Sequence, residues 1–454
     1  MAVRFVIIGA GPAGHQAATH AARLGADVTL VERDLLGGSA NLWDCIPSKA
    51  MIATGGVMSL TRRAHRMGLS GLDASLDLQA LRDRIEGITG HLERSITQLM
   101  ASQGVRVVRG TGTFKSAHEV VVDTGDGPMV ELDADAVLLS TGSRPRVPGW
   151  AEVDGERVLV TRQAYPPPEV PEHLVVIGSG VTGVEFVHMF RSFGSRVTLI
   201  VSRQQVLPQK DPEVAAALES DFLRRDVVLC KGARAVGIER TADGVVVSCD
   251  DGRVARGSHA LLAVGSVPNS ESLGLAAAGV AAGDGGYVVV NQHCQSNVPH
   301  VYAAGDLSGK LPLASVASTQ GRKVAEHVMG LHTREHRHLD YDKAASAIFT
   351  EPEIADVGLA EAEAFAGGRK IRVTKVPVAA NARALIDGDA RGFVKILSDP
   401  ATGVVLGGSI VGDRAAELIS VIALAVTANL RVTDIVESLL VHPALAEALA
   451  DAAE

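Results

Sequence analysis

Residues 3–32 read VRFVIIGAGPAGHQAATHAARLGADVTLVE. An apolar run ending at Ile8 is typical of a buried parallel strand, and the Ala-rich stretch up to Leu24 has helical character. A glycine-rich turn separates the two, and a second apolar strand over residues 28–31 ends on Glu32. This order of strand, turn, helix and strand predicts an α/β fold of the dinucleotide-binding kind.

The turn has the pattern Gly-x-Gly-x-x-Gly. Such a turn lets the backbone approach a pyrophosphate closely and place it at a helix N-terminus, where free N–H groups favour an anion. The carboxylate at the following strand end is suited to accept hydrogen bonds from a ribose. The predicted cofactor contacts are therefore Gly9, Gly11, Pro12, Ala13, Gly14 and Glu32.

The same pattern returns over residues 174–203, which read LVVIGSGVTGVEFVHMFRSFGSRVTLIVSR. Here the second strand ends on Val201, so the carboxylate is missing, and a hydroxyl and a guanidinium follow it. These groups suit the 2′-phosphate of NADPH, although the third glycine is more common in NAD-type turns, and use of both nucleotides stays open. The predicted contacts are Gly178, Gly180, Val181, Thr182, Gly183, Ser202 and Arg203.

Composition narrows the class of protein. The chain has 454 residues, enough for about three domains, with 46% hydrophobic and 21% charged residues. A formal net charge of −9 with no basic run gives no electrostatic case for binding nucleic acid or an anionic membrane, and no apolar run is long enough to span a bilayer. Four widely spaced cysteines suggest neither disulfides nor a metal site. We expect a reduced, cytoplasmic enzyme without a metal.

Further motifs make the chain resemble the flavoprotein pyridine nucleotide–disulfide oxidoreductases over essentially its whole length. Dihydrolipoamide dehydrogenase, glutathione reductase, mercuric reductase and soluble transhydrogenase are members of this family. The motifs, besides the two glycine turns, are Thr141-Gly142-Ser143-Arg144-Pro145, Ala263-Val264-Gly265-Ser266-Val267-Pro268-Asn269, Ala304-Gly305-Asp306, Phe349-Thr350-Glu351-Pro352-Glu353-Ile354, Asn381-Ala382-Arg383-Ala384 and His442-Pro443.

This resemblance implies an α/β fold with two Rossmann-like dinucleotide-binding domains, for FAD and for NAD(P), and a C-terminal α+β dimerisation domain. We expect the first part of the FAD domain over residues 1–150 and the NAD(P) domain over 151–268. A central segment over 269–336 would complete the FAD domain, and the dimerisation domain would cover 337–454. The family resemblance also implies a homodimer in which that last domain completes the partner's site.

The resemblance also assigns roles to residues. The aspartate matching Asp306 holds the ribityl chain of the flavin. The lysine matching Lys49 lies near flavin N5 and pairs with the glutamate matching Glu185, which makes physical sense because a cation stabilises negative charge on a reduced flavin. The remaining expected cofactor contacts are Gly38, Ser39, Thr141, Gly142, Gly265, Gly305 and Ala314.

One departure from the family pattern changes the expected chemistry. The family has two redox cysteines, with four residues between them, before Ile-Pro-Ser-Lys, but here Ala40 takes the first position and only Cys45 remains. Thiol–disulfide exchange needs the second thiol to resolve the mixed disulfide. The other cysteines are interpreted as structural thiols. Beside Cys45, the bulky Trp43 and the acidic Asp44 are unusual for the family, and either reshape the acceptor pocket or serve in packing and capping.

The segment from His442 to Glu447 resembles the region that provides the family's general acid–base. In those enzymes the histidine, oriented by the glutamate, reaches across the dimer to the partner's cysteines. A histidine held by a carboxylate can exchange a proton near neutral pH. Its presence without the dithiol suggests that it still donates a proton to an acceptor, although it could also be a remnant of a disulfide-reducing ancestor.

We therefore predict an FAD-dependent oxidoreductase that passes hydride from NADPH or NADH through flavin to a non-disulfide acceptor, most readily a quinone. Lipoamide-dehydrogenase-like quinone reductases have the same Ala-for-Cys change. The alternatives are a soluble NAD(P) transhydrogenase, a lipoamide-dehydrogenase-like disulfide reductase, which the missing cysteine disfavours, and a peroxidase or CoA-disulfide reductase that uses Cys45 alone. A flavoprotein without turnover is the non-enzyme alternative.

Overall fold

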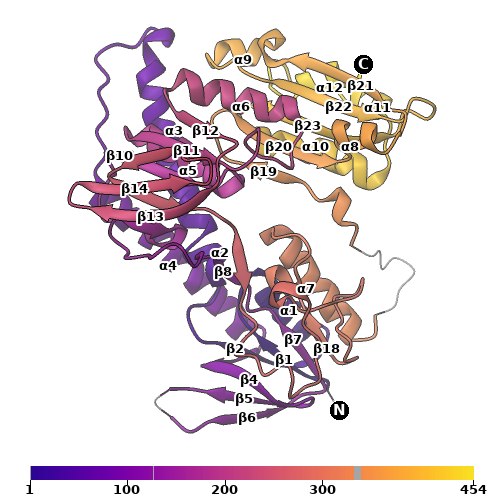
Figure 1. Ribbon diagram of the computed structural model, residues 1–454. Coiled ribbons are helices and arrows are strands. Elements are labelled where there is room, and N and C mark those ends of the chain that lie inside the picture. Colours follow the sequence, from indigo (N-terminus) through magenta and orange to yellow (C-terminus); the bar gives the residue numbers. More distant parts are fainter. Residues whose placement is uncertain (1, 126, 332–338) are drawn as a thin grey trace. The chain divides into compact units, whose positions relative to one another are not determined.

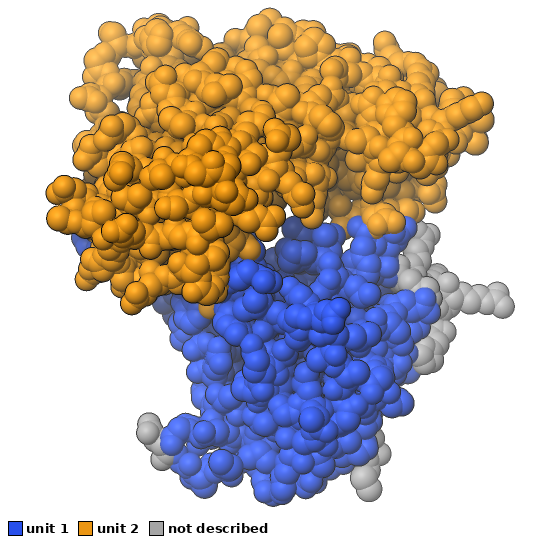
Figure 2. Space-filling model, viewed as in Figure 1, with its two compact units in different colours: residues 1–48, 79–146, 265–341 blue, residues 49–78, 147–264, 342–454 orange. Residues whose placement is uncertain are grey.

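The computed structural model describes residues 2–125, 127–331 and 339–454. The chain forms two compact units, each assembled from segments far apart in the sequence (Figure 2). The expected four-part division of the chain stays a prediction, and its boundary at residue 336 lies outside the described residues. Unit 1 comprises Met1–Ser48, Gln79–Arg146 and Gly265–Tyr341, and unit 2 comprises Lys49–Leu78, Val147–Val264 and Asp342–Glu454.

Unit 1 is built on a parallel five-stranded sheet with the strand order β18-β7-β1-β2-β3. The central strand β1 is flanked on both sides, with Ile8 opposite Val31 and Leu139, so the carboxyl ends of three strands meet at one edge. Ligands of open α/β sheets bind at this edge. The strands are β1 (Arg4–Ile8), β2 (Asp27–Glu32), β3 (Arg106–Arg109), β7 (Ala136–Leu139) and β18 (Val301–Ala303).

Two helices lie side by side near this sheet, α1 (Pro12–Arg23) and α7 (Ala314–Val328) (Figure 1). Alternate strand residues such as Phe5 and Ile7 join one core cluster with both helices, and α4 (Leu78–Ser102) contributes to the same cluster. The side chains on the opposite face pack against an antiparallel sheet. Its strands are β4 (Thr111–Ser116), β5 (Glu119–Asp123) and β6 (Val130–Asp133).

Unit 2 contains a second parallel sheet, with the order β12-β11-β10-β16-β9. The helix α5 (Val181–Phe193) packs against β10 and β11, and α6 (Pro212–Arg224) follows β11 in the chain. The parallel strands are β9 (Val158–Val160), β10 (His173–Ile177), β11 (Arg196–Val201), β12 (Val228–Lys231) and β16 (His259–Leu262). A small antiparallel sheet of β13 (Ala235–Thr241), β14 (Gly244–Cys249) and β15 (Val254–Gly257) shares their core.

The C-terminal part of unit 2 is an antiparallel sheet with the order β19-β20-β23-β22-β21. Three helices pack with it into one core cluster. The strands are β19 (Ser346–Ile348), β20 (Glu353–Gly358), β21 (Arg372–Pro377), β22 (Phe393–Ser398) and β23 (Val405–Gly412). The helices are α10 (Ala415–Ala428), α11 (Val432–Val436) and α12 (Glu447–Ala453), and two further short helices, α8 (Glu361–Ala366) and α9 (Ala382–Ile386), precede them in the chain.

The remaining elements carry several candidate site residues. The short helix α2 (Gly38–Leu42) and the longer α3 (Cys45–Arg63) follow the first dinucleotide-binding turn. The strands β8 (Ser143–Pro145) and β17 (Ser266–Pro268) pair with each other in unit 1. Residues 51–104 are largely helical, because they hold most of α3 and all of α4. Among the described residues, every helix is either too short or too polar to span a lipid bilayer.

Candidate active site

The first glycine turn is shaped by close backbone packing. A Cβ added to Gly14 would lie 1.9 Å from the carbonyl oxygen of Gly9, and one added to Gly9, which has a φ of +103°, would lie 2.5 Å from that of Ser140. Around Gly11, in contrast, the nearest atom to an added Cβ is 3.9 Å away. The outer two glycines therefore let helix and strand approach each other, and the middle one faces free space at the N-terminus of α1, where a pyrophosphate fits.

Glu32 lies beside this turn at the end of β2. Its carboxylate accepts the N–H of Ala10 at 2.7 Å with one oxygen and the N–H of Asp34 at 2.8 Å with the other. These bonds hold the buried carboxylate in place, and each oxygen keeps capacity for a further hydrogen bond. Glu32 is thus placed to bind a ribose diol next to the pyrophosphate position.

The predicted contacts Gly38 and Ser39 are brought to the same turn. A Cβ on Gly38, which has a φ of +63°, would lie 2.6 Å from the Cα of Gly11, so only glycine fits there without displacing the turn. Ser39 follows on α2 and accepts the N–H groups of Trp43 and Asp44 through its carbonyl oxygen.

Asp306 lies on a short 3-10 turn, Gly305–Ser308, just beyond β18. The hydroxyl of Ser143 donates to its carboxylate at 2.6 Å, and the N–H of Gly305 donates to the side chain of Gln320 at 2.7 Å. Gln320 is fully buried on α7, the helix that Ala314 begins. Ser143 and Gln320 were missed as site residues by the sequence reasoning, because such bonds join distant segments and follow no spacing pattern.

Thr141 and Gly142 are hydrogen-bonded to Asn269, the residue after β17. The Thr141 hydroxyl donates to the carbonyl of Asn269 at 2.7 Å, and the Asn269 amide donates back to the carbonyl of Thr141 at 2.9 Å. Gly142 and Gly265 both have positive φ, +67° and +92°, where side chains are strained. Together with the glycine turn, Glu32 and Asp306, this part of unit 1 fits an FAD molecule.

The second glycine turn repeats the first in unit 2. Added Cβ atoms would lie 1.8 Å from a backbone oxygen at Gly183 and 2.3 Å from one at Gly178, whereas Gly180 has free space around it. Val181 and Thr182 are exposed in the first turn of α5, and Val201 is buried at the end of β11. Both Ser202 and Arg203, just beyond Val201, are exposed. The second turn thus fits a nucleotide whose ribose meets a hydroxyl and a guanidinium.

Lys49 and Glu185 form an ion pair within unit 2. The Lys49 Nζ lies 2.7 Å from one carboxylate oxygen of Glu185, and the other oxygen accepts the backbone N–H of Phe349 at 3.0 Å. The same ammonium lies 4.7 Å from the centre of the Phe349 ring. Glu185 is buried on α5, so a fixed carboxylate and an aromatic ring orient the lysine. Phe349 stands in a family motif, but its contacts were not predicted.

Cys45 is the first residue of α3, and its half-buried thiol is not part of a disulfide. Its carbonyl accepts the hydroxyl of Ser48 at 2.8 Å, and Lys49 stands one helical turn further on. Ala40 occupies α2. The described residues include three other free cysteines, of which Cys249 and Cys294 are buried, and no cluster of His, Cys, Asp or Glu side chains that could bind a metal ion.

His442 and Glu447 also form a pair. The His442 Nδ1 lies 2.8 Å from one oxygen of Glu447, and the other oxygen accepts the N–H of Ala444 at 2.8 Å. These two bonds lower the pKa of Glu447, with the amide contributing most. Because a carboxylate only accepts hydrogen bonds, Nδ1 is the donor, and Nε2 is the nitrogen that can take up and release a proton. The His442 side chain is 73% exposed.

Comparison with known proteins identifies the family of the chain. The family described as pyridine nucleotide-disulphide oxidoreductase matches residues 3–321, and its dimerisation domain matches residues 344–453. A protein named NAD(P)H dehydrogenase (quinone), from Mycobacterium tuberculosis, is 40% identical over 100% of this chain and 94% of its own length. A dihydrolipoyl dehydrogenase from Haloferax volcanii is 35% identical over 99% of this chain and 95% of its own.

A solved structure extends the likeness to the whole fold. The crystal structure of LpdA from Mycobacterium tuberculosis has a TM-score of 0.94 to this chain at 40% identity, covering 99% of each. The glycine turns, the acidic residue after the first and the two fitted nucleotide sites thus stand in a chain that matches the family from end to end. The chain belongs to the pyridine nucleotide-disulphide oxidoreductase family and is an FAD-dependent NAD(P)H oxidoreductase.

Proposed function

We propose that this oxidoreductase passes electrons from NAD(P)H to a quinone and does not reduce disulfides. The observation that carries the proposal is Ala40, which stands where the family has the thiol that attacks a disulfide. A methyl group can neither form nor resolve a mixed disulfide. If Cys45 formed a mixed disulfide with a substrate, a second thiol from elsewhere would have to resolve it.

The other buried cysteines are poor substitutes for that second thiol. Burial raises the pKa of Cys249, and it raises the pKa of Cys294 to about 11. A thiol must be deprotonated to attack a disulfide, so at neutral pH these groups stay unreactive. The proposed route is direct transfer from reduced flavin to a diffusible acceptor. The 40% identical relative named NAD(P)H dehydrogenase (quinone) supports a quinone as that acceptor.

The net reaction converts NAD(P)H, one proton and a quinone into NAD(P)+ and a hydroquinone. Bound FAD supplies the step between the two, because it accepts a hydride and passes on two electrons. A hydroquinone contains two protons more than the quinone, and a hydride supplies only one of them. A residue of the chain is suited to donate the second proton. We assign this role to His442, whose Nε2 would donate to a quinone oxygen while Glu447 stabilises the charged ring.

Lys49 is assigned the role of holding positive charge beside the flavin. Its ion pair with the buried Glu185 and its contact with Phe349 fix the ammonium in one position. A fixed cation stabilises negative charge that develops on a bound cofactor without reorganisation during the reaction. Asp306 and Glu32 would hold the ribityl chain and the ribose of FAD.

We further propose a homodimer in which His442 acts on the partner's flavin. The family's dimerisation domain covers residues 344–453 and so includes His442. Large apolar side chains are exposed in this part of unit 2, as expected for a surface that is covered by a second protein. They include Leu385, Ile386, Val421, Leu424, Leu439 and Val441.

NADPH is the proposed electron donor, because Ser202 and Arg203 are exposed at the strand end where NAD-specific turns have a carboxylate. Arg203→Glu should therefore raise the KM for NADPH more than tenfold and leave that for NADH nearly unchanged. Equal effects on the two nucleotides would count against this preference.

The proposed reaction is tested by steady-state oxidation of NADPH with menadione, with lipoamide and with thio-NAD+. Turnover with menadione alone supports the proposal, and turnover with thio-NAD+ would indicate a transhydrogenase. Cys45→Ser gives a second test. Direct transfer to a quinone should stay within about threefold of the wild type in this variant, whereas any reaction through a sulfenate or mixed disulfide would be abolished.

A further inference from the structure

The segment of residues 439–446, here called the His442 segment, joins α11 to α12. Its outer part has little support from the chain itself, since Leu439 and Val441 are fully or mostly exposed. Nevertheless, His442 must hold its ring in one orientation to transfer a proton efficiently, because misplacement of a catalytic group by about 1 Å can cost a hundredfold in rate. The contacts that fix this segment therefore bear on the reaction.

The fixed point is the peptide of Ala444, two residues after His442. Its N–H donates to Glu447 at 2.8 Å. Its carbonyl accepts the side-chain amide of Asn381 at 3.0 Å. Ala444 is thus bonded on one side by the carboxylate that also orients His442 and on the other by an amide from a distant part of the chain.

Asn381 is well suited to hold a neighbouring segment. It is 5% exposed, and its oxygen accepts the N–H of Ala384 at 3.1 Å as the N-cap of α9. The cap fixes the amide group, so its nitrogen is held where one N–H donates to the carbonyl of Ala444. The two ends of the amide make different hydrogen bonds. The oxygen accepts from α9, and the nitrogen donates to the His442 segment.

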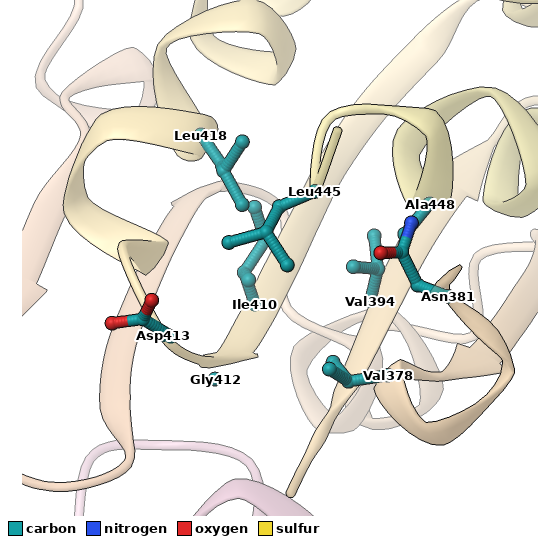
Figure 3. Close-up of a pocket in the computed structure, with 9 residues that line it drawn as sticks. All are labelled: Val378, Asn381, Val394, Ile410, Gly412, Asp413, Leu418, Leu445 and Ala448. Carbon is teal, nitrogen blue, oxygen red and sulfur yellow. The ribbon is translucent and has the colours of Figure 1, made fainter. Parts of the chain in front are cut away.

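Apolar packing beside this bond is incomplete. Figure 3 shows Leu445 pointing toward Leu418 and Ile410, with the Asn381 amide reaching up toward the level of Ala448. The space enclosed there has about 10 Å³ of room, at the lower limit for one water molecule, and its lining is mainly apolar. Leu445 alone therefore does not lock the segment, and the polar bond to Asn381 adds a directional restraint.

We propose that Asn381 is a positioning residue for His442, which it fixes through the carbonyl of Ala444. The inference rests on the proposed role of His442 as proton donor to a quinone. Asn381 touches neither the acceptor nor the flavin in this account, so its loss should affect only the step that needs a proton from His442.

The test compares a variant that exchanges the donor for a carboxylate oxygen with one that loses both functions. Asn381→Asp has the same size and keeps the oxygen that caps α9, but it cannot donate to Ala444. Asn381→Ala loses the cap as well. Asn297→Asp controls for the chemical exchange at an exposed position, because Asn297 makes the same pair of bonds elsewhere, accepting the N–H of Ala281 and donating to the carbonyl of Gly279.

Flavin reoxidation is then measured in the holoenzyme with menadione and with ferricyanide. Ferricyanide takes electrons without protons, so it reports flavin reduction and access without His442. We expect Asn381→Asp to lower the menadione rate by about 5- to 30-fold and to leave the ferricyanide rate unchanged. The defect should shrink as the pH is lowered, because solvent protons replace the donor. Asn297→Asp should change neither rate.

Backbone hydrogen exchange of peptides covering residues 439–450 provides a readout that does not depend on activity. Asn381→Asp should speed exchange in these peptides while those covering α9 keep their protection. Unchanged exchange, or equal losses with both acceptors, would overturn the inference. His442→Gln separates this from the proposed function: if that variant reduces menadione at the wild-type rate, the proton role of His442 fails, and faster exchange in Asn381→Asp would then show the restraint alone.

Discussion

At the scale of single residues, the proposed function makes Ala40 the residue that decides which acceptor the enzyme can use. The flavin and nucleotide sites keep the family's glycines and acidic residues, while the position that attacks a disulfide has lost its sulfur. Lys49 with Glu185 and His442 with Glu447 are each in hydrogen-bonding distance in the structure. The groups to which we assign charge and proton handling are thus paired in the structure, while the proposed first redox position holds Ala40.

The buried His188, one turn after Glu185 on α5, should make stability sensitive to acid. Burial, followed by the charge of Arg225, lowers the pKa of His188 to about 3. In the folded chain the His188 ring therefore stays neutral down to about pH 3, while in the unfolded chain it binds a proton below about pH 6.5. Its contribution to stability is complete above pH 6.5 and is lost progressively as the pH falls toward 3, by about 2 kcal/mol at pH 5.

His188→Gln tests this, because glutamine does not titrate and can still accept the hydrogen bond that Arg225 makes to His188 Nδ1 at 3.0 Å. Urea unfolding of the wild type and the variant at pH 7.5 and 5.0 should show a smaller acid-dependent loss in the variant. An equal loss in both proteins would place the acid sensitivity elsewhere.

At the scale of elements, the close contact of α1 and α7 shapes the flavin site. A Cβ added to Gly321 on α7 would lie 2.1 Å from the carbonyl oxygen of Ala13. Gln320, the neighbouring residue, accepts the N–H of Gly305 beside Asp306. The approach of the two helices therefore determines where the carboxylate that would hold the ribityl chain can lie.

Gly321→Ala should separate the two helices, lower stability by about 1–3 kcal/mol and weaken retention of FAD. Thermal unfolding and the ratio of flavin to protein absorbance after dialysis measure both effects. The matched control is Gly87→Ala on the exposed side of α4, where nothing lies within 4 Å of an added Cβ, and this change should stabilise by up to about 1 kcal/mol. Wild-type stability in Gly321→Ala would mean that the helices can shift at little cost.

The helices and strands near the site could be predicted from the sequence, but several contacts between them could not. The apolar strands, the glycine turns and the helix after each turn follow local patterns, and the elements appear close to where these patterns predict them, although α5 begins at Val181, three residues before the predicted start at Val184. Ser143, Gln320, Phe349 and Asn381 had no predicted contacts in the site. Each acts through one hydrogen bond to a residue more than ten positions away, and no local pattern encodes such a bond.

At the scale of the whole molecule, the proposal makes each active site depend on two subunits. Co-expression of His442→Gln with Lys49→Met tests this. If His442 acts in the partner's site, a hybrid dimer has one site with both residues intact. Random pairing makes half of the dimers hybrids, so the mixture should show about a quarter of wild-type quinone reductase activity. Activity no higher than in either single variant would mean that His442 acts within its own subunit.

The central claim is that electrons pass from reduced flavin to a quinone without a dithiol. Its most direct test is anaerobic reduction of the purified protein by NADPH in a stopped-flow instrument, followed by mixing with menadione or with lipoamide. The account predicts full two-electron bleaching of the flavin, rapid reoxidation by menadione and none by lipoamide. Reoxidation by lipoamide at a comparable rate would contradict it, because a second thiol would then be working with Cys45.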